Sequence, residues 1–153
     1  MIQLTENFLL NELIATNTGL ANEPNEIERQ KLLYLAIYIL QPIRNEWGRL
    51  QITSGFRSEA VNIAIGGQST SQHRLGEAAD FIPLGFNNIA IQDPVKYMDT
   101  VFEWIVKRSN LKYGQCIRES KNGKNWIHIS LVRYGRPNQQ ALTYDGKEFK
   151  TYV

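Results

Sequence analysis

The dipeptide Asn122-Gly123 is the feature that most constrains how this chain can fold. Asn-Gly between two strand-forming segments favours the tight two-residue turn of an antiparallel β-hairpin. The flanking segments 113–119 and 125–132 both have strand character. With the dipeptide at the centre of the turn, Glu119 lies directly opposite Trp126, and the register of the whole hairpin follows.

This register divides the hairpin into two faces, because side chains alternate along a strand. Glu119, Trp126 and His128 share one face. Glu119 is the diagonal neighbour of His128, at a backbone separation of about 7–8 Å. The other face is apolar and is expected to join the core; it carries Cys116, Ile127, Ile129 and Leu131. One face of a single hairpin therefore presents a carboxylate, an indole and an imidazole together.

Helical patterns precede and separate the short strands. The expected helices are a short one near 9–15, a long one over 26–47 capped by Asn25 and bent at Pro42, one over 58–65, and one from Pro94 to about Arg108. The expected strands are 50–54, 78–82 and the hairpin, with a loop at 69–75 and an edge hairpin of 142–144 and 148–153. This order predicts an α+β fold, in which helices pack on a small, mainly antiparallel sheet.

Length and composition limit the class of protein. At 153 residues, we expect a single domain over 1–153, with a motif-bearing core at about 26–132. Residues 133–153 form a tail that either covers a cleft or completes the sheet. One cysteine excludes an internal disulfide and a cysteine-based zinc site. A net charge of +2 gives no argument for nucleic-acid binding, and we expect a monomer.

No segment reaches the roughly 18 apolar residues of a membrane span, so membrane insertion is not expected. No basic residue precedes Arg29, which argues against a secretory signal. We therefore expect synthesis in the cytoplasm. Action on a cell wall would require another agent to release the protein.

The chain has only two histidines, and each has a suggestive setting. His73 lies seven residues before Asp80, and His128 lies in the middle of a predicted strand. Two imidazoles and one carboxylate form a common open zinc site, in which the pKa of a fourth ligand, water, falls to about 7. A single histidine in a strand, however, more often has a structural role than a metal-binding one. A buried Asp80 needs a partner for its charge, and an arginine is such a partner as well as a metal. The residue types alone leave the zinc site open.

Three motifs in order carry a resemblance to a known family. The segment SQHRLGEAAD fits Ser-x-His-x-x-Gly-x-Ala-x-Asp. Upstream, ITSGFRS resembles Ser-Gly-Tyr-Arg-Ser with Phe56 in place of Tyr, and downstream WIHIS resembles Trp-x-His-x-Ser. Together they resemble the zinc D-Ala-D-Ala carboxypeptidase family of murein peptidases, in particular its phage and prophage branch. The hedgehog signalling domain shares this family's fold, and the resemblance covers about residues 1–132.

The resemblance implies one Zn²⁺ ion, with His73, Asp80 and His128 as its ligands. It also implies that Arg57 lies at the site and binds either a substrate carboxylate or the developing oxyanion, both of which suit a guanidinium. The alternative for Arg57 is a surface ion pair with the nearby Glu59.

One position departs from the family pattern. Many members carry their general base three residues before the last histidine, where this chain has Asn125, which cannot take a proton. In the phage branch and in the hedgehog domain, a glutamate of the preceding strand lies there instead, and Glu119 matches it. Glu119 is therefore the expected base; if it points away, the site binds zinc without catalysis. Trp126 either forms a wall of the peptide-binding site or packs against neighbouring side chains. Ser71 and Gln72 either hold the loop that carries His73 or contact the substrate.

The implied activity is that of a zinc metallopeptidase that hydrolyses peptidoglycan stem peptides. D-Ala-D-Ala carboxypeptidase and L-Ala-D-Glu endopeptidase action are both open, and a lysis role in a phage or prophage fits the expected localisation. The alternative from another class is a non-catalytic, zinc-stabilised module that binds the cell wall or belongs to a phage structure. A base beside the metal argues for the enzyme.

Overall fold

Six strands form one mixed sheet in the order β1-β2-β4-β3-β5-β6. The structure is a computed structural model and describes residues 1–153. The strands are β1 (Arg49–Ser54), β2 (Ala78–Gly85), β3 (Gln115–Lys121), β4 (Lys124–Ser130), β5 (Gln140–Tyr144) and β6 (Phe149–Thr151). The helices are α1 (Leu10–Ile14), α2 (Glu26–Leu35), α3 (Gln41–Trp47), α4 (Glu59–Ala64) and α5 (Pro94–Lys107), with a π-helical turn η1 (Ala36–Leu40) and a 3₁₀ turn η2 (Gln72–Leu75).

The expected α+β class is confirmed. Four of the five strand pairings are antiparallel, but the fifth is parallel, so the sheet is mixed. The predicted tail hairpin is present as β5 and β6, which pair antiparallel at the edge of the sheet. β5 joins β3 in parallel, so the sheet has six strands and is mixed. A parallel neighbour needs a crossover connection, and nothing local in the sequence marks that pairing.

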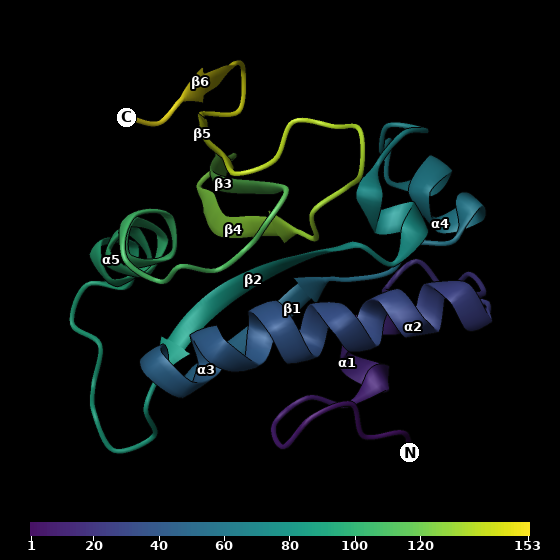
Figure 1. Cartoon of the computed structure of the whole chain (residues 1–153), viewed down its shortest axis with the longest axis horizontal. Helices are drawn as coiled ribbons and strands as arrows, with labels where there is room; N and C mark the ends of the chain where they lie inside the picture. The colour runs from purple at the N-terminus through teal and green to yellow at the C-terminus, as the bar shows by residue number, and fades with distance from the viewer.

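The segment 26–47 is continuously helical and runs along β1 and β2 (Figure 1). Its start is the expected capping box, since Asn25 accepts a hydrogen bond from the Glu28 amide at 2.9 Å and donates its own amide to the Glu28 carboxylate at 2.7 Å. A π-helical turn, η1, ends two residues before Pro42. Proline lacks an amide hydrogen and crowds the carbonyl four residues earlier, and a widened turn relieves that crowding.

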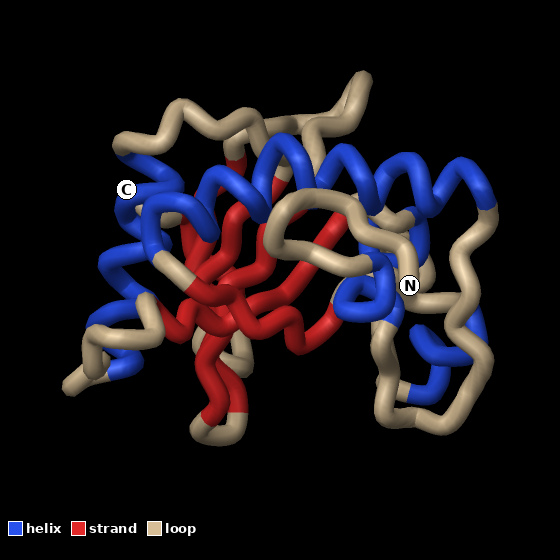
Figure 2. The backbone as a smooth tube through the Cα atoms, turned by 90° about the horizontal axis from the view of Figure 1, so that it is seen from below, coloured by secondary structure: helices blue, strands red, loops and turns tan.

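The N-terminal segment belongs to the core. Phe8, Leu10 and Leu13 are buried in one cluster with the helices and the sheet. The Leu13 carbonyl accepts a hydrogen bond from the Phe56 amide at 2.7 Å, and this contact fixes the loop that follows β1. Figure 2 shows the helical layer along one side of the strands. No helix combines the length and the apolar composition that crossing a membrane would require.

A buried amide secures the same loop. Asn22 donates to the carbonyls of Ile14 and Phe56, both at 2.8 Å, and accepts from the Ser58 amide at 2.7 Å. Burying these backbone groups without partners would be unfavourable, so Asn22 stabilises the loop 55–58 in one conformation. This loop carries Arg57.

Candidate metal centre

The hairpin register follows the sequence-based prediction. β3 and β4 pair Glu119 with Trp126, Ser120 with Asn125 and Lys121 with Lys124. On the other side of β4, β2 places Asp80 directly opposite His128. Directly opposed side chains on one face lie within contact distance. The sheet therefore brings together a carboxylate and an imidazole that are 48 residues apart in the chain.

His73 lies on η2, where the sequence predicted only a loop. The Ser71 hydroxyl accepts a hydrogen bond from the His73 amide at 3.2 Å, and Gly76 ends the turn with a φ of +72°. A Cβ on Gly76 would lie 2.6 Å from the Glu28 carbonyl oxygen, so glycine is needed here for close packing of the turn against α2. The turn directs the His73 ring inward, where it is buried.

A backbone carbonyl orients that ring. His73 Nδ1 lies 2.7 Å from the Gly55 carbonyl oxygen. A carbonyl only accepts, so Nδ1 carries the hydrogen and the lone pair is on Nε2, which lies 3.2 Å from Asp80 Oδ1. Fixing the second ring nitrogen in this way is typical of histidines that bind metals.

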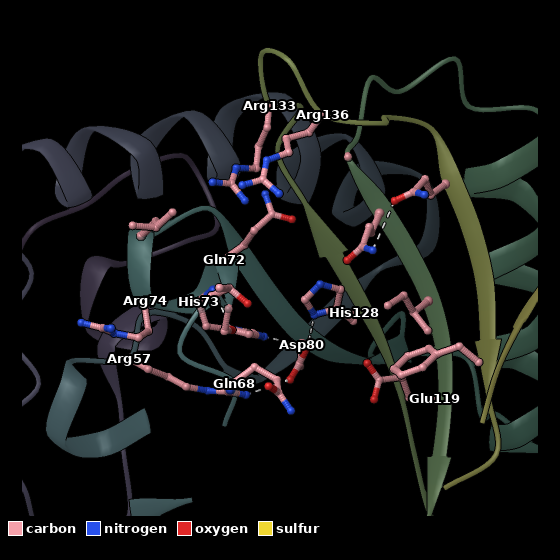
Figure 3. A pocket seen from close by; sticks show the side chains of 18 of the residues that line it. Arg57, Gln68, Gln72, His73, Arg74, Asp80, Glu119, His128, Arg133 and Arg136 are labelled. Carbon is pink, nitrogen blue, oxygen red and sulfur yellow. Dashed lines mark hydrogen bonds and ion pairs between the residues drawn. The ribbon is translucent and has the colours of Figure 1, made fainter. Parts of the chain in front are cut away.

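The three side chains fit a zinc ion. Asp80 Oδ1 lies 2.8 Å from His128 Nδ1, and the ligand atoms of His73, Asp80 and His128 lie within 4.8 Å of one another. Two imidazole nitrogens and one carboxylate oxygen are the donor set of an open zinc site. Figure 3 shows the three side chains converging on one point of the cleft.

The charge states suit metal binding. Burial alone would raise the pKa of Asp80, but the two imidazoles beside it outweigh this effect and hold its pKa well below the usual range. Burial lowers the pKa of His73, which keeps its imidazole neutral. Metal ligands must be deprotonated, and both groups meet this condition at neutral pH.

Arg57 contacts the cluster and forms no ion pair with Glu59. Its Nη2 lies 3.5 Å from Asp80 Oδ2, and its Nε donates to the Ser54 hydroxyl at 2.9 Å. Its backbone amide also donates to the His73 carbonyl at 3.0 Å. Oδ2 of Asp80 thus pairs with the guanidinium of Arg57, while Oδ1 lies next to the two imidazoles.

Glu119 points into the cleft from the neighbouring strand (Figure 3). Burial, followed by the nearby charge of Asp80, raises the pKa of Glu119 to about 7. A carboxyl group with a pKa near neutrality is able both to accept and to return a proton. Trp126 borders the same cleft, and its buried indole nitrogen has no hydrogen-bond partner.

All eight side chains predicted from the sequence border one cleft of about 720 Å³: Arg57, Ser71, Gln72, His73, Asp80, Glu119, Trp126 and His128. Gln72 donates to the Leu131 carbonyl at 3.4 Å, which ties the His73 turn to the chain after β4. The Gly55 carbonyl could not be predicted from the sequence, because a backbone group has no signature of its own. Arg133 and Arg136 were not predicted either, because they lie in the tail that the family motifs do not reach.

A comparison with family models supports the same identification. The model of the family described as Peptidase M15 matches residues 3–111, which is more than half of the chain. The matched span contains Arg57, His73 and Asp80, while Glu119 and His128 follow it. No curated protein matches the chain. The chain belongs to the Peptidase M15 family, the zinc peptidase family that its three motifs resemble.

Proposed function

We propose that this protein is a zinc-dependent peptidase that hydrolyses peptidoglycan stem peptides. One observation carries the proposal: Glu119 enters the cleft from β3 and faces a His-Asp-His cluster built by η2, β2 and β4. A non-catalytic zinc module would gain nothing from a partly buried carboxylate at this place. The family supports a peptidase, and the motifs support peptidoglycan as the substrate.

The residues divide the chemistry among them. His73, Asp80 and His128 would hold the ion, and Zn²⁺ supplies Lewis-acid activation of water and of the substrate carbonyl when it is bound. Glu119 removes the proton from the attacking water and returns it to the leaving amine nitrogen. Arg57 stabilises negative charge at the cleft, on a substrate carboxylate or on the developing oxyanion.

The remaining residues position the substrate. Ser71 and Gln72 hold the His73 turn and face the cleft, and Trp126 offers a wall for a peptide stem. Cleavage of either of two peptide bonds in the stem peptide is compatible with this arrangement. A carboxypeptidase would use Arg57 for the free terminal carboxylate of D-Ala-D-Ala, whereas an L-Ala-D-Glu endopeptidase would use it for the oxyanion. Lysis in a phage or prophage setting is the biological role that we attach to either activity.

The test is to incubate the zinc-loaded protein with purified peptidoglycan and to identify the products by mass spectrometry. Loss of terminal D-Ala would mean a carboxypeptidase, and release of stem peptides would mean an endopeptidase. Each product should disappear with a chelator and with Glu119→Gln, which is expected to lower turnover by roughly 10²–10⁴-fold. Zinc binding without any product from walls of several chemotypes would refute the peptidase and favour the non-catalytic module.

A further inference from the structure

The connection from β4 to β5, residues 131–139, forms one wall of the cleft. At its start, the Leu131 amide donates to the Glu77 carbonyl at 2.8 Å, and the Leu131 carbonyl accepts from Gln72. At its end, the Gln139 amide donates to the Tyr113 carbonyl at 2.9 Å. The segment is therefore attached at both ends beside the candidate metal ligands.

Within this segment, a tight turn presents two arginines. The Arg136 amide donates to the Arg133 carbonyl at 3.4 Å across the turn, and Gly135 has a φ of +72°. The Asn138 side chain accepts from the Arg133 amide at 2.9 Å and donates to the carbonyls of Arg133 and Arg136 at 3.0 and 3.1 Å. One side chain thus satisfies three backbone groups, so the positions of both arginines are built into the fold.

Both arginines border the cleft, and Figure 3 shows them above Gln72, with His73 between them and Arg57. Arg136 forms no ion pair. Arg133 Nε approaches the Glu77 carboxylate to 3.3 Å without making a hydrogen bond, and Glu77 is already paired with Lys31 at 3.1 Å. Like charges that border one cleft repel each other unless an anion binds with them, and each guanidinium matches the geometry of a carboxylate.

The charge of the cleft favours the same kind of ligand. Its lining contains four arginines and only two carboxylates, Asp80 and Glu119. Asp80 is occupied by the imidazoles and Arg57. A cleft with this excess of positive charge concentrates anionic ligands, and neither tail arginine has a carboxylate that is hydrogen-bonded to it.

We infer that Arg133 and Arg136 form a carboxylate-binding subsite that selects peptides with a second free carboxylate, away from the bond that is cleaved. This inference rests on the proposed peptidase function. It assigns the tail a role in substrate choice. The carboxylate that the tail arginines bind is distinct from the anion that Arg57 is proposed to bind. The substrate class is an acidic peptide, and its amidated form is the disfavoured analogue.

The experiment uses two synthetic stem peptides that are identical except that one carries a free carboxylate where the other carries a carboxamide. Binding is measured by calorimetry on zinc-loaded Glu119→Gln protein, and hydrolysis is measured on the wild type. We expect the acidic peptide to bind about tenfold more tightly, as a charge-assisted bidentate contact allows. Arg136→Gln and Arg133→Gln should remove this preference and leave binding of the carboxamide peptide unchanged.

Arg108→Gln is the matched control, because it removes one exposed arginine that lies outside the cleft. Arg136 is itself exposed, so its substitution leaves the fold intact. Equal binding of the two peptides, binding of neither, or a preference that survives in the arginine variants would overturn the subsite. Preferential binding without hydrolysis by the wild type would refute the peptidase and keep the subsite. Hydrolysis of both peptides at equal rates would support the peptidase and refute the subsite.

Discussion

The candidate metal centre contains two carboxyl groups, Asp80 and Glu119, whose burial makes their charged forms unfavourable. Asp80 is buried and is stabilised by two imidazoles and a guanidinium. Glu119 has no such partner, and its pKa is raised to about 7 mainly because it is buried. Carboxylates are retained in such surroundings where activity needs them, at the expense of stability.

Glu119→Gln is expected to stabilise the zinc-free protein at neutral and alkaline pH. Folding raises the pKa of Glu119 from 4.5 to about 7, so the folded protein holds this proton more tightly than the unfolded chain. The stability that depends on this proton is fully present below pH 4.5 and is lost as the pH rises through 7. Glutamine does not ionise, so the advantage of the variant grows across that window.

The measurement is urea unfolding of both proteins in the presence of a chelator, at several pH values from acid to alkaline. The difference in unfolding free energy at alkaline pH is expected to be on the order of 1 kcal/mol, after allowance for solvent screening. A difference that does not change with pH would contradict the raised pKa.

Asp80→Asn is expected to weaken zinc binding by roughly 100-fold or more, since it removes the only anionic ligand of the cluster. Asp99→Asn is the matched control, because Asp99 pairs with Arg118 at 2.7 Å and is not part of the cluster. Competition with a chromophoric chelator measures both affinities. Unchanged zinc affinity in Asp80→Asn would show that the cluster is not the metal site.

At the scale of elements, the site depends on how neighbouring segments hold the loop between β1 and α4. Gly55 supplies the carbonyl that orients His73, and this glycine packs directly on the end of α1. A Cβ at residue 55 would lie 2.2 Å from the Leu13 carbonyl oxygen. The N-terminal helix and the ligand geometry are therefore coupled through one glycine.

Gly55→Ala is expected to destabilise the fold by roughly 1–3 kcal/mol, through overpacking against backbone that cannot yield. It should also weaken zinc binding by roughly 10–100-fold, because the carbonyl that orients His73 is displaced. Gly66→Ala provides the comparison: a Cβ there meets nothing within 4 Å, and only its φ of +73° is strained. Thermal unfolding and zinc titration are measured on both. Equal zinc affinity in the two variants would contradict the coupling.

At the scale of the whole molecule, the tail is integrated with the rest of the chain. β5 extends the sheet from β3, and Tyr152 packs on Phe102 of α5 with ring centroids 4.9 Å apart. The Tyr152 amide also donates to the Ala141 carbonyl at 2.8 Å. We propose that residues 1–153 form one cooperative domain, in which the tail both completes the sheet and walls the cleft.

Tyr152→Ala is expected to lower the unfolding free energy by roughly 1–2 kcal/mol, because it removes an edge-to-face aromatic pair and its buried area. Tyr134→Ala alters a fully exposed tyrosine of the same tail and should change stability by no more than about 0.5 kcal/mol. Chemical unfolding is followed by both circular dichroism and tryptophan fluorescence. Two separate transitions in the wild type would refute the single domain.

Much of the site could be predicted from sequence because its features are local. The register that places Glu119 opposite Trp126 follows from two turn residues and the alternation of side chains. The capping box at Asn25 follows from a spacing of three residues. The ligand set His73, Asp80 and His128 came from the motifs, and the structure brings these three side chains together.

Tertiary structure alone decided the features that join distant segments. Three features depend on contacts between segments far apart in the chain: the parallel pairing of β5 with β3, the burial of Phe8 in the core, and the Gly55 carbonyl on His73. So does the approach of Arg133 and Arg136 to the cleft. By itself, the sequence determined turns, caps, faces and the chemical types at the site, because these depend on neighbours within a few residues. Which segments meet is decided by the packing of the whole core, since non-local pairings have no local signature.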